Sequence, residues 1–137
     1  MLVGRTGKLP KLLLLLWAYL VVWVPMNFAL LASRALPSLG VRGWVATLEI
    51  TVHAFVTLAC GVSGWMLRAR TGAGRPLAAA ALMANAVASA QSLYISTLPH
   101  DVPPGLAGPL MLAAFTNATA WVLYLYTSKR LRSWLAP

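Results

Sequence analysis

The chain has 137 residues, of which 60% are hydrophobic and only 9% are charged. Because an average soluble domain is roughly 25% charged, this composition indicates an integral membrane protein and excludes a soluble enzyme or a disordered chain. Basic residues outnumber acidic ones by 11 to 2. Since the basic residues flank apolar runs, they point to the lipid bilayer and its anionic headgroups as partners, and not to nucleic acid.

The first two apolar runs are each about as long as a membrane-spanning helix, which needs about 20 residues. Residues 12–31 follow a basic start and form a run too long for the core of a signal peptide, so we expect a retained span. Pro25 should bend this span. Residues 43–67 form the second run, which is long enough to tilt in the bilayer.

The last two runs complete the predicted bundle. Residues 76–98 open with Pro76, which is tolerated in a first helical turn because its missing N–H would be unpaired there anyway. Residues 106–127 follow a turn-rich loop. We therefore expect an all-α fold, an integral membrane four-helix bundle that forms a single domain over residues 1–137.

Charge predicts the orientation of the bundle. The two ends of the chain and the middle loop carry nine basic residues, whereas the other two loops carry two. The positive-inside rule places both termini in the cytoplasm. A composition rich in Ala, Leu, Arg, Trp and Gly suggests a bacterium of high genomic GC, so we expect a multi-pass protein of the bacterial inner membrane. The predicted anchors to lipid headgroups are Lys129, Arg130, Arg132, Arg68 and Arg70.

Six polar residues inside the apolar runs are the candidate ligand- or proton-binding residues. At about 1.5 Å of rise per residue, three of them should share an outer layer and three a central layer. Glu49 and His53 lie one turn apart on one helix face. We expect Glu49 to point into the bundle, toward an outer-layer amide, with Arg42 as a second partner. The outer layer is Asn27, Glu49 and Gln91, and the central layer is His53, Asn85 and Asn117.

These polar residues allow two interpretations. Ionisable residues inside a membrane are rare and usually functional, so Glu49 could bind a proton or a cation, and a Glu–His pair could relay a proton. Alternatively, the polar groups form a neutral hydrogen-bonded network that fixes helix register. We assign the second role to the four amides and the first to Glu49, and leave His53 between them.

The sequence predicts no metal or cofactor and no enzymatic activity. Glu49 and His53 supply two ligands, whereas zinc takes three or four from the protein. Only His100 and Asp101, in an outer loop, could add to them, and a haem held by His53 and His100 would need ligands at very different depths. Cys60 is the only cysteine, which excludes an intramolecular disulfide. No Ser–His–Asp or Cys–His set is present.

The stretch from Trp121 to Arg130, WVLYLYTSKR, resembles the end of a small four-span bacterial inner-membrane family, the domain of unknown function 2569. In that family the last span closes with Trp-x-x-Tyr and runs into Ser-Lys-Arg. Glu49 matches a glutamate of its second span, and Arg68, Arg70 and Pro76 match its basic turn and following proline. The chain departs from the pattern after Arg130. The resemblance implies a topology but no activity.

Short loops and the lack of catalytic sets favour a non-catalytic accessory or assembly partner of an envelope membrane complex. Its partners would be another membrane protein or further copies of the chain. The alternative is a proton- or cation-coupled small transporter that works as an oligomer with Glu49 at its site. The small multidrug transporters place their glutamate in the first span, where this chain has no acidic residue. An enzyme is the third interpretation.

Overall fold

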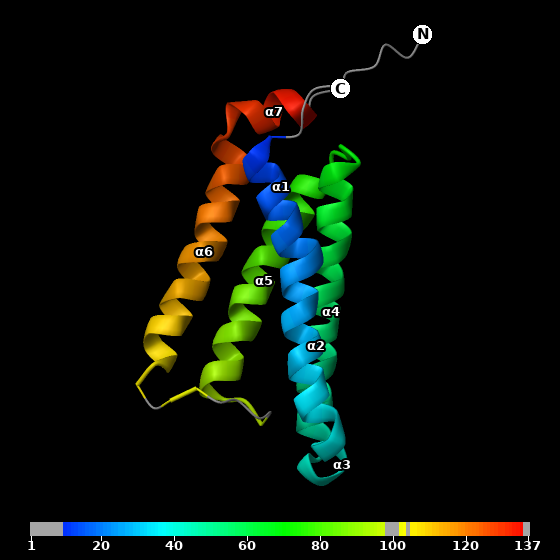
Figure 1. Ribbon diagram of the computed structural model, residues 1–137, viewed down its shortest axis with the longest axis vertical. Helices are drawn as coiled ribbons and strands as arrows, with labels where there is room; N and C mark the ends of the chain where they lie inside the picture. The colour runs from blue at the N-terminus through cyan, green and yellow to red at the C-terminus, as the bar shows by residue number, and fades with distance from the viewer. Residues whose placement is uncertain (1–9, 98–101, 104, 136–137) are drawn as a thin grey trace.

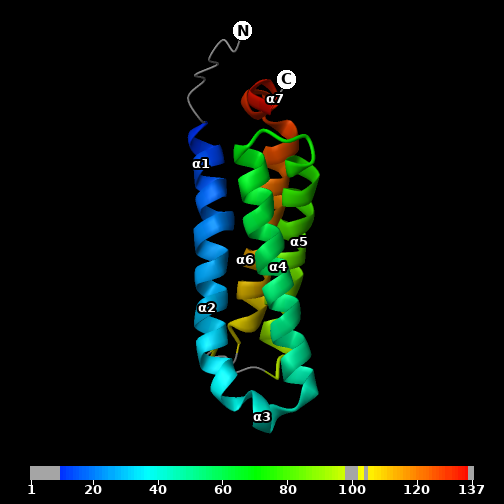
Figure 2. The same ribbon diagram turned by 90° about the vertical axis from the view of Figure 1, so that its right-hand side faces the viewer.

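The computed structural model describes residues 10–97, 102–103 and 105–135, and this part of the chain contains helices and turns but no strand. Four long helical segments run side by side (Figures 1 and 2). Each is long and apolar enough to cross a membrane. The predicted all-α class is therefore confirmed, and the segments are Lys11–Arg42, Trp44–Arg68, Gly74–Tyr94 and Ala107–Thr127.

The first segment is a series of helical pieces. It comprises α1 (Lys11–Ala18), the π-helical turn η1 (Tyr19–Trp23), α2 (Val24–Ala35), the 3-10 turn η2 (Leu36–Ser38) and α3 (Leu39–Arg42). The π turn lies directly before Pro25, whose ring would clash with a carbonyl one turn earlier in a regular α-helix. A π turn relieves such a clash. Helical structure continues well past residue 31, the predicted end of this span.

The other elements are α4 (Trp44–Arg68), α5 (Gly74–Tyr94), α6 (Ala107–Thr127) and α7 (Lys129–Leu135). Pro76 lies in the first turn of α5, as the sequence predicts. However, α5 ends at Tyr94, before the predicted boundary at residue 98. The short α7 was not predicted. It begins after Ser128, whose hydroxyl accepts a hydrogen bond from the Leu131 N–H at 3.3 Å, the usual N-cap arrangement.

The packing order places α5 between α4 and α6, and the first segment along α4. We call the end of the bundle that carries the start of α1, the α4–α5 turn and α7 the terminal end, and the opposite end, which carries α3, the loop end (Figure 1). Most of the buried apolar core lies toward the terminal end. Its largest fully buried side chains are Leu13, Leu16, Leu20, Leu67, Leu82, Leu125 and Leu131.

Candidate functional site

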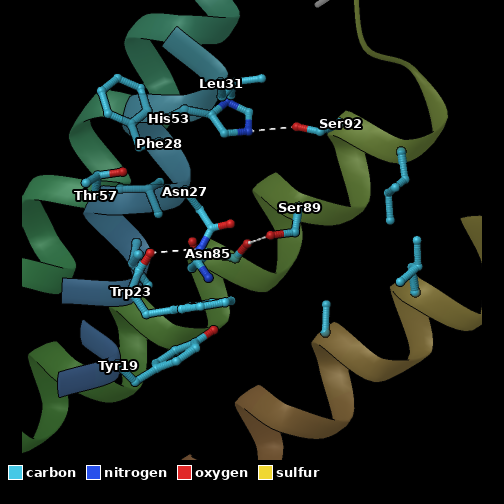
Figure 3. A pocket seen from close by; sticks show the side chains of 15 residues that line it. Tyr19, Trp23, Asn27, Phe28, Leu31, His53, Thr57, Asn85, Ser89 and Ser92 are labelled. Carbon is cyan, nitrogen blue, oxygen red and sulfur yellow. Dashed lines mark hydrogen bonds between the residues drawn. The ribbon is translucent and has the colours of Figure 1, made fainter. Parts of the chain in front are cut away.

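A cavity of about 380 Å³ lies between the four spans. Small-molecule pockets are typically about 300–1,000 Å³ in volume. The first span and α6 face each other across the cavity, and α4 and α5 complete its wall (Figure 3). Apolar and aromatic side chains supply much of this wall. The lining residues are Tyr19, Trp23, Val24, Asn27, Phe28, Leu31, His53, Val56, Thr57, Asn85, Ser89, Ser92, Leu93, Leu110 and Ala114.

His53 joins α4 to α5 at the wall of this cavity. Its Nδ1 lies 2.9 Å from the backbone carbonyl oxygen of Glu49, one turn earlier. Its Nε2 lies 2.8 Å from the hydroxyl oxygen of Ser92 on α5 (Figure 3). A carbonyl oxygen only accepts, so Nδ1 carries a proton and donates a hydrogen bond to the backbone carbonyl of Glu49. The imidazole orientation is thus fixed at both nitrogens.

The Ser92 hydroxyl can satisfy His53 in either protonation state. Besides the imidazole, its oxygen lies 3.0 Å from the carbonyl oxygen of Ala88. A hydroxyl has one proton to donate and can also accept. With a neutral imidazole, Ser92 donates to Nε2. With a protonated imidazole, Nε2 donates to Ser92, which in turn donates to Ala88. A rotation of one O–H bond therefore accommodates a proton on His53.

Two amides of the predicted set also line the cavity. Asn27 donates from Nδ2 to the Trp23 carbonyl of its own helix at 2.8 Å, which leaves its amide oxygen facing the cavity without a donor among the described residues. Asn85 interacts through its side chain with the hydroxyl of Tyr19. The structure therefore brings Asn27, His53 and Asn85 to one cavity, although the sequence assigned them to two layers.

Glu49 is buried, with 5% of its surface exposed, and does point into the bundle. Its predicted partners were wrong. One carboxylate oxygen accepts a hydrogen bond from the Ser96 hydroxyl, and the other accepts from the Thr97 N–H at 3.0 Å and the Thr97 hydroxyl at 2.9 Å. The chain leaves α5 at Tyr94 and turns back over α4. Ser96 and Thr97 therefore occupy the positions next to the Glu49 carboxylate that an outer-layer amide was expected to occupy. Glu49 does not line the cavity.

Arg42 and the remaining amides also differ from their predicted places. Arg42 donates to the Thr97 carbonyl and, at 2.8 Å, to the Ser38 hydroxyl, so it joins the Glu49 cluster through Thr97 and not through the carboxylate. Gln91 and Asn117 have exposed side chains and do not line the cavity. Asn117 nonetheless interacts with the Tyr19 hydroxyl.

Two serines of the cavity wall were missed at the sequence level. Ser89 and Ser92 follow Asn85 at spacings of four and three residues, which places all three on one helix face. That spacing is a usable signal. Tyr19 and Trp23 also line the cavity and precede Asn27 at four-residue intervals, so the same spacing signal was available for them.

The predicted headgroup anchors fall into two groups. Arg68 lies over the Trp17 ring at 5.1 Å, and Arg70 lies over the Trp134 ring at 4.3 Å, distances at which cation–π attraction is effective. The other three are exposed on the surface of α7: Lys129, Arg130 and Arg132. Within the described residues no three His, Cys, Asp or Glu side chains come together as a metal site would require. His100 and Asp101 lie outside those residues.

Comparison with known protein families, with curated proteins and with solved structures found no match to this chain. The resemblance to the domain of unknown function 2569 therefore stays a prediction.

Proposed function

We propose that the protein is a non-catalytic membrane protein that binds a small, uncharged amphiphile in the cavity between its spans. The observation that carries this proposal is the cavity wall, where aromatic and aliphatic side chains surround a few hydrogen-bonding groups. Such a wall suits a ligand with a flat or aliphatic body and one polar head. None of the described residues that line it carries a permanent charge, and burying an unpaired ligand charge there would be unfavourable.

The arrangement of the helices supports entry from the bilayer. The first span packs against α4, and α6 packs against α5. Asn27 of the first span and Leu110 of α6 therefore line the cavity from two helices that are each supported by a different neighbour. Figure 1 shows these two helices diverging toward the loop end. An amphiphile dissolved in the membrane would pass between them without crossing a polar loop. In the cell, such a protein would serve as an accessory subunit that presents or holds the amphiphile for a larger envelope complex of the bacterial inner membrane.

The test is binding of three neutral probes: an alkyl-benzoquinone, an alkylphenol and a monoacylglycerol. Binding to the detergent-purified protein is measured by native mass spectrometry. Ala114→Phe fills the cavity from α6, whereas Ala113→Phe adds the same ring to the neighbouring exposed position. We expect Ala114→Phe to weaken probe binding at least tenfold and Ala113→Phe to leave it unchanged. Equal effects of the two variants, or no binding of any probe, would contradict the proposal.

A second candidate function is proton-coupled binding and transport, with His53 in place of Glu49 as the proton site. The supporting observation is that Ser92 can pair with the imidazole in both protonation states. Of the neighbouring titratable groups, Tyr19 of η1 lines the same cavity and Glu49 of α4 is turned toward Ser96 and Thr97, while α5 and α6 contribute none to the cavity wall.

Two variants separate His53 from Glu49 as the proton site. His53→Gln keeps hydrogen-bonding capacity but cannot titrate, so it should abolish the pH dependence of probe uptake into proteoliposomes. Glu49→Gln should leave that pH dependence in place. If instead Glu49→Gln removes the pH dependence and His53→Gln does not, the assignment to His53 is wrong and the original prediction for Glu49 is favoured.

A further inference from the structure

A second cavity, of about 570 Å³, lies at the terminal end, between the α4–α5 turn, the start of α5, the end of α6 and α7. Arg75 and Arg132 line it and, among the described residues, no acidic residue does. Pro76, Tyr126 and Leu135 supply the rest of its larger side chains. It is thus a cationic cavity with an apolar border.

Arg75 is incompletely paired within the protein. Its guanidinium lies 5.8 Å from the centre of the Tyr126 ring, while its Nε is buried and has no hydrogen-bond acceptor among the described residues. The other buried side-chain donors without a partner in this part of the chain are the indole N–H groups of Trp17 and Trp134. All three are donors, and a buried donor without an acceptor is unfavourable. Of these three residues, only Arg75 lines the cavity.

Among the described residues, no acidic side chain lies at this cavity. Only two acidic residues are present against eleven basic ones. Glu49 is bonded to Ser96 and Thr97 beyond the far end of α5, and Asp101 lies outside the described residues. Among the described residues that line the cavity, nothing balances the positive charges of Arg75 and Arg132, and an anion from outside the chain would do so.

The walls of the cavity are held in place before any anion binds. The backbone of Arg70 is left-handed, with φ of 58°, and its guanidinium rests on Trp134 of α7. The Thr71 N–H donates to the Met66 carbonyl at 3.1 Å, which closes the turn. On the other side, the buried Leu131 fixes α7 against the bundle. A preformed site loses less entropy on binding than a flexible one.

We propose that this cavity binds the phosphate group of an anionic phospholipid, with Arg75 and Arg132 as its ligands. Guanidinium groups pair with phosphate oxygens through two parallel N–H donors. The cavity lies where α4 ends and α5 begins, which is the depth of lipid headgroups for a bundle of this length. Tyr126 and Leu135 border it with apolar surface suited to the glycerol and upper acyl chain. The proposal does not depend on the cavity between the spans.

The test measures retention of phosphatidylglycerol by the full-length protein. The protein is purified in dodecyl maltoside with equal phosphatidylglycerol and phosphatidylcholine, and bound lipid is counted by native mass spectrometry. Arg75→Gln and Arg132→Gln should each reduce retention of phosphatidylglycerol about tenfold, as expected for loss of a charge-assisted hydrogen bond. Arg130→Gln is the matched control, because it removes the same charge from the exposed surface of α7 without touching the cavity.

Each outcome of this test decides the proposal. Loss with Arg75→Gln and Arg132→Gln but not with Arg130→Gln supports it, and Arg132→Gln guards against misfolding because the residue is exposed. Equal losses in all three variants would show diffuse attraction to charge and overturn the site. Binding of inorganic phosphate to the wild-type protein without selective retention of phosphatidylglycerol over phosphatidylcholine would show that a soluble phosphate is bound and would overturn the lipid assignment.

Discussion

Glu49 fastens the segment that follows α5 to the face of α4. Three donors from Ser96 and Thr97 converge on its two carboxyl oxygens. Glu49→Gln replaces one of those acceptor oxygens by an NH₂ group, which cannot accept. We expect the free energy of unfolding to fall by about 1–3 kcal/mol, measured by SDS-induced unfolding in mixed micelles.

A double-mutant cycle with Thr97→Val provides the control for this prediction. Valine keeps the shape of Thr97 but removes the hydroxyl that donates to Glu49 at 2.9 Å. If the two side chains interact as the structure shows, the two changes together should destabilise less than the sum of their separate effects. Strict additivity would mean that Glu49 stabilises the protein through other groups.

Gly64 lies where α4 packs tightly against the first span. A Cβ at this position would lie 2.7 Å from the Cγ2 of Val21 and 3.2 Å from the Cβ of Leu20. Because valine is stiff about χ1, the neighbour cannot simply rotate away. Gly64→Ala should therefore destabilise the bundle by about 1–3 kcal/mol, measured as a lower thermal unfolding temperature in detergent.

Gly61 is the matched control on the same helix. A Cβ there would have no atom within 4 Å, so Gly61→Ala should be neutral or should stabilise α4 by up to about 1 kcal/mol through helix propensity. If both substitutions destabilise equally, the cost arises from the helix itself and not from its contact with η1.

At the scale of whole elements, α7 closes the terminal end through one buried side chain. Leu131 is fully buried, whereas the basic residues on either side of it are exposed. Leu131→Ala should release α7 from the bundle, since truncating a buried leucine typically costs about 2–5 kcal/mol. Trypsin should then cleave after Arg130 and Arg132 several-fold faster than in the wild-type protein. The cleavage rate is measured by mass spectrometry of the released fragments. Ser133→Ala, at an exposed position of the same helix, should leave the cleavage rate unchanged.

The spans could be predicted from apolar length, but their ends could not. The predicted apolar run extends to residue 98, whereas α5 ends at Tyr94. The residues after it, Ser96 and Thr97, lie outside the helix and donate hydrogen bonds to Glu49. A tertiary contact of this kind has no periodic signal. Similarly, α7 is too short for an amphipathic pattern to be recognised in the sequence. Its position depends on the packing of Leu131 against the buried core.

The candidate site was only partly predictable for a related reason. Depth along a helix predicted one layer for Asn85 and His53, because rise per residue is constant, and both line the same cavity. Depth does not show which way a side chain points around the helix axis. Gln91 was therefore expected inside the bundle, whereas it is exposed. In the first span, Asn27 lines the same cavity as His53 and Asn85, and Glu49 does not.

At the scale of the whole molecule, an even number of spans returns the chain to the side on which it began. The four spans and the position of α7 beside the start of α1 (Figure 1) place the described ends of the chain together. The terminal end also carries Lys11, Arg68, Arg70, Arg75 and the three basic residues of α7, while Arg34 and Arg42 belong to the loop end. Positive charge is retained in the cytoplasm during insertion.

We therefore expect a fluorescent protein fused after Pro137 to fold and fluoresce, because it would stay in the cytoplasm. Alkaline phosphatase inserted at Pro103, in the connection between α5 and α6, should be active, because that connection would face the periplasm. The reciprocal fusions, with the reporters exchanged, should both be inactive and serve as controls. Reports from the same side at both positions would contradict four spans. Reports from opposite sides with the pattern inverted would keep the four spans but show that charge does not set the orientation of this bundle, and Arg75 and Arg132 would then face lipid of the opposite leaflet.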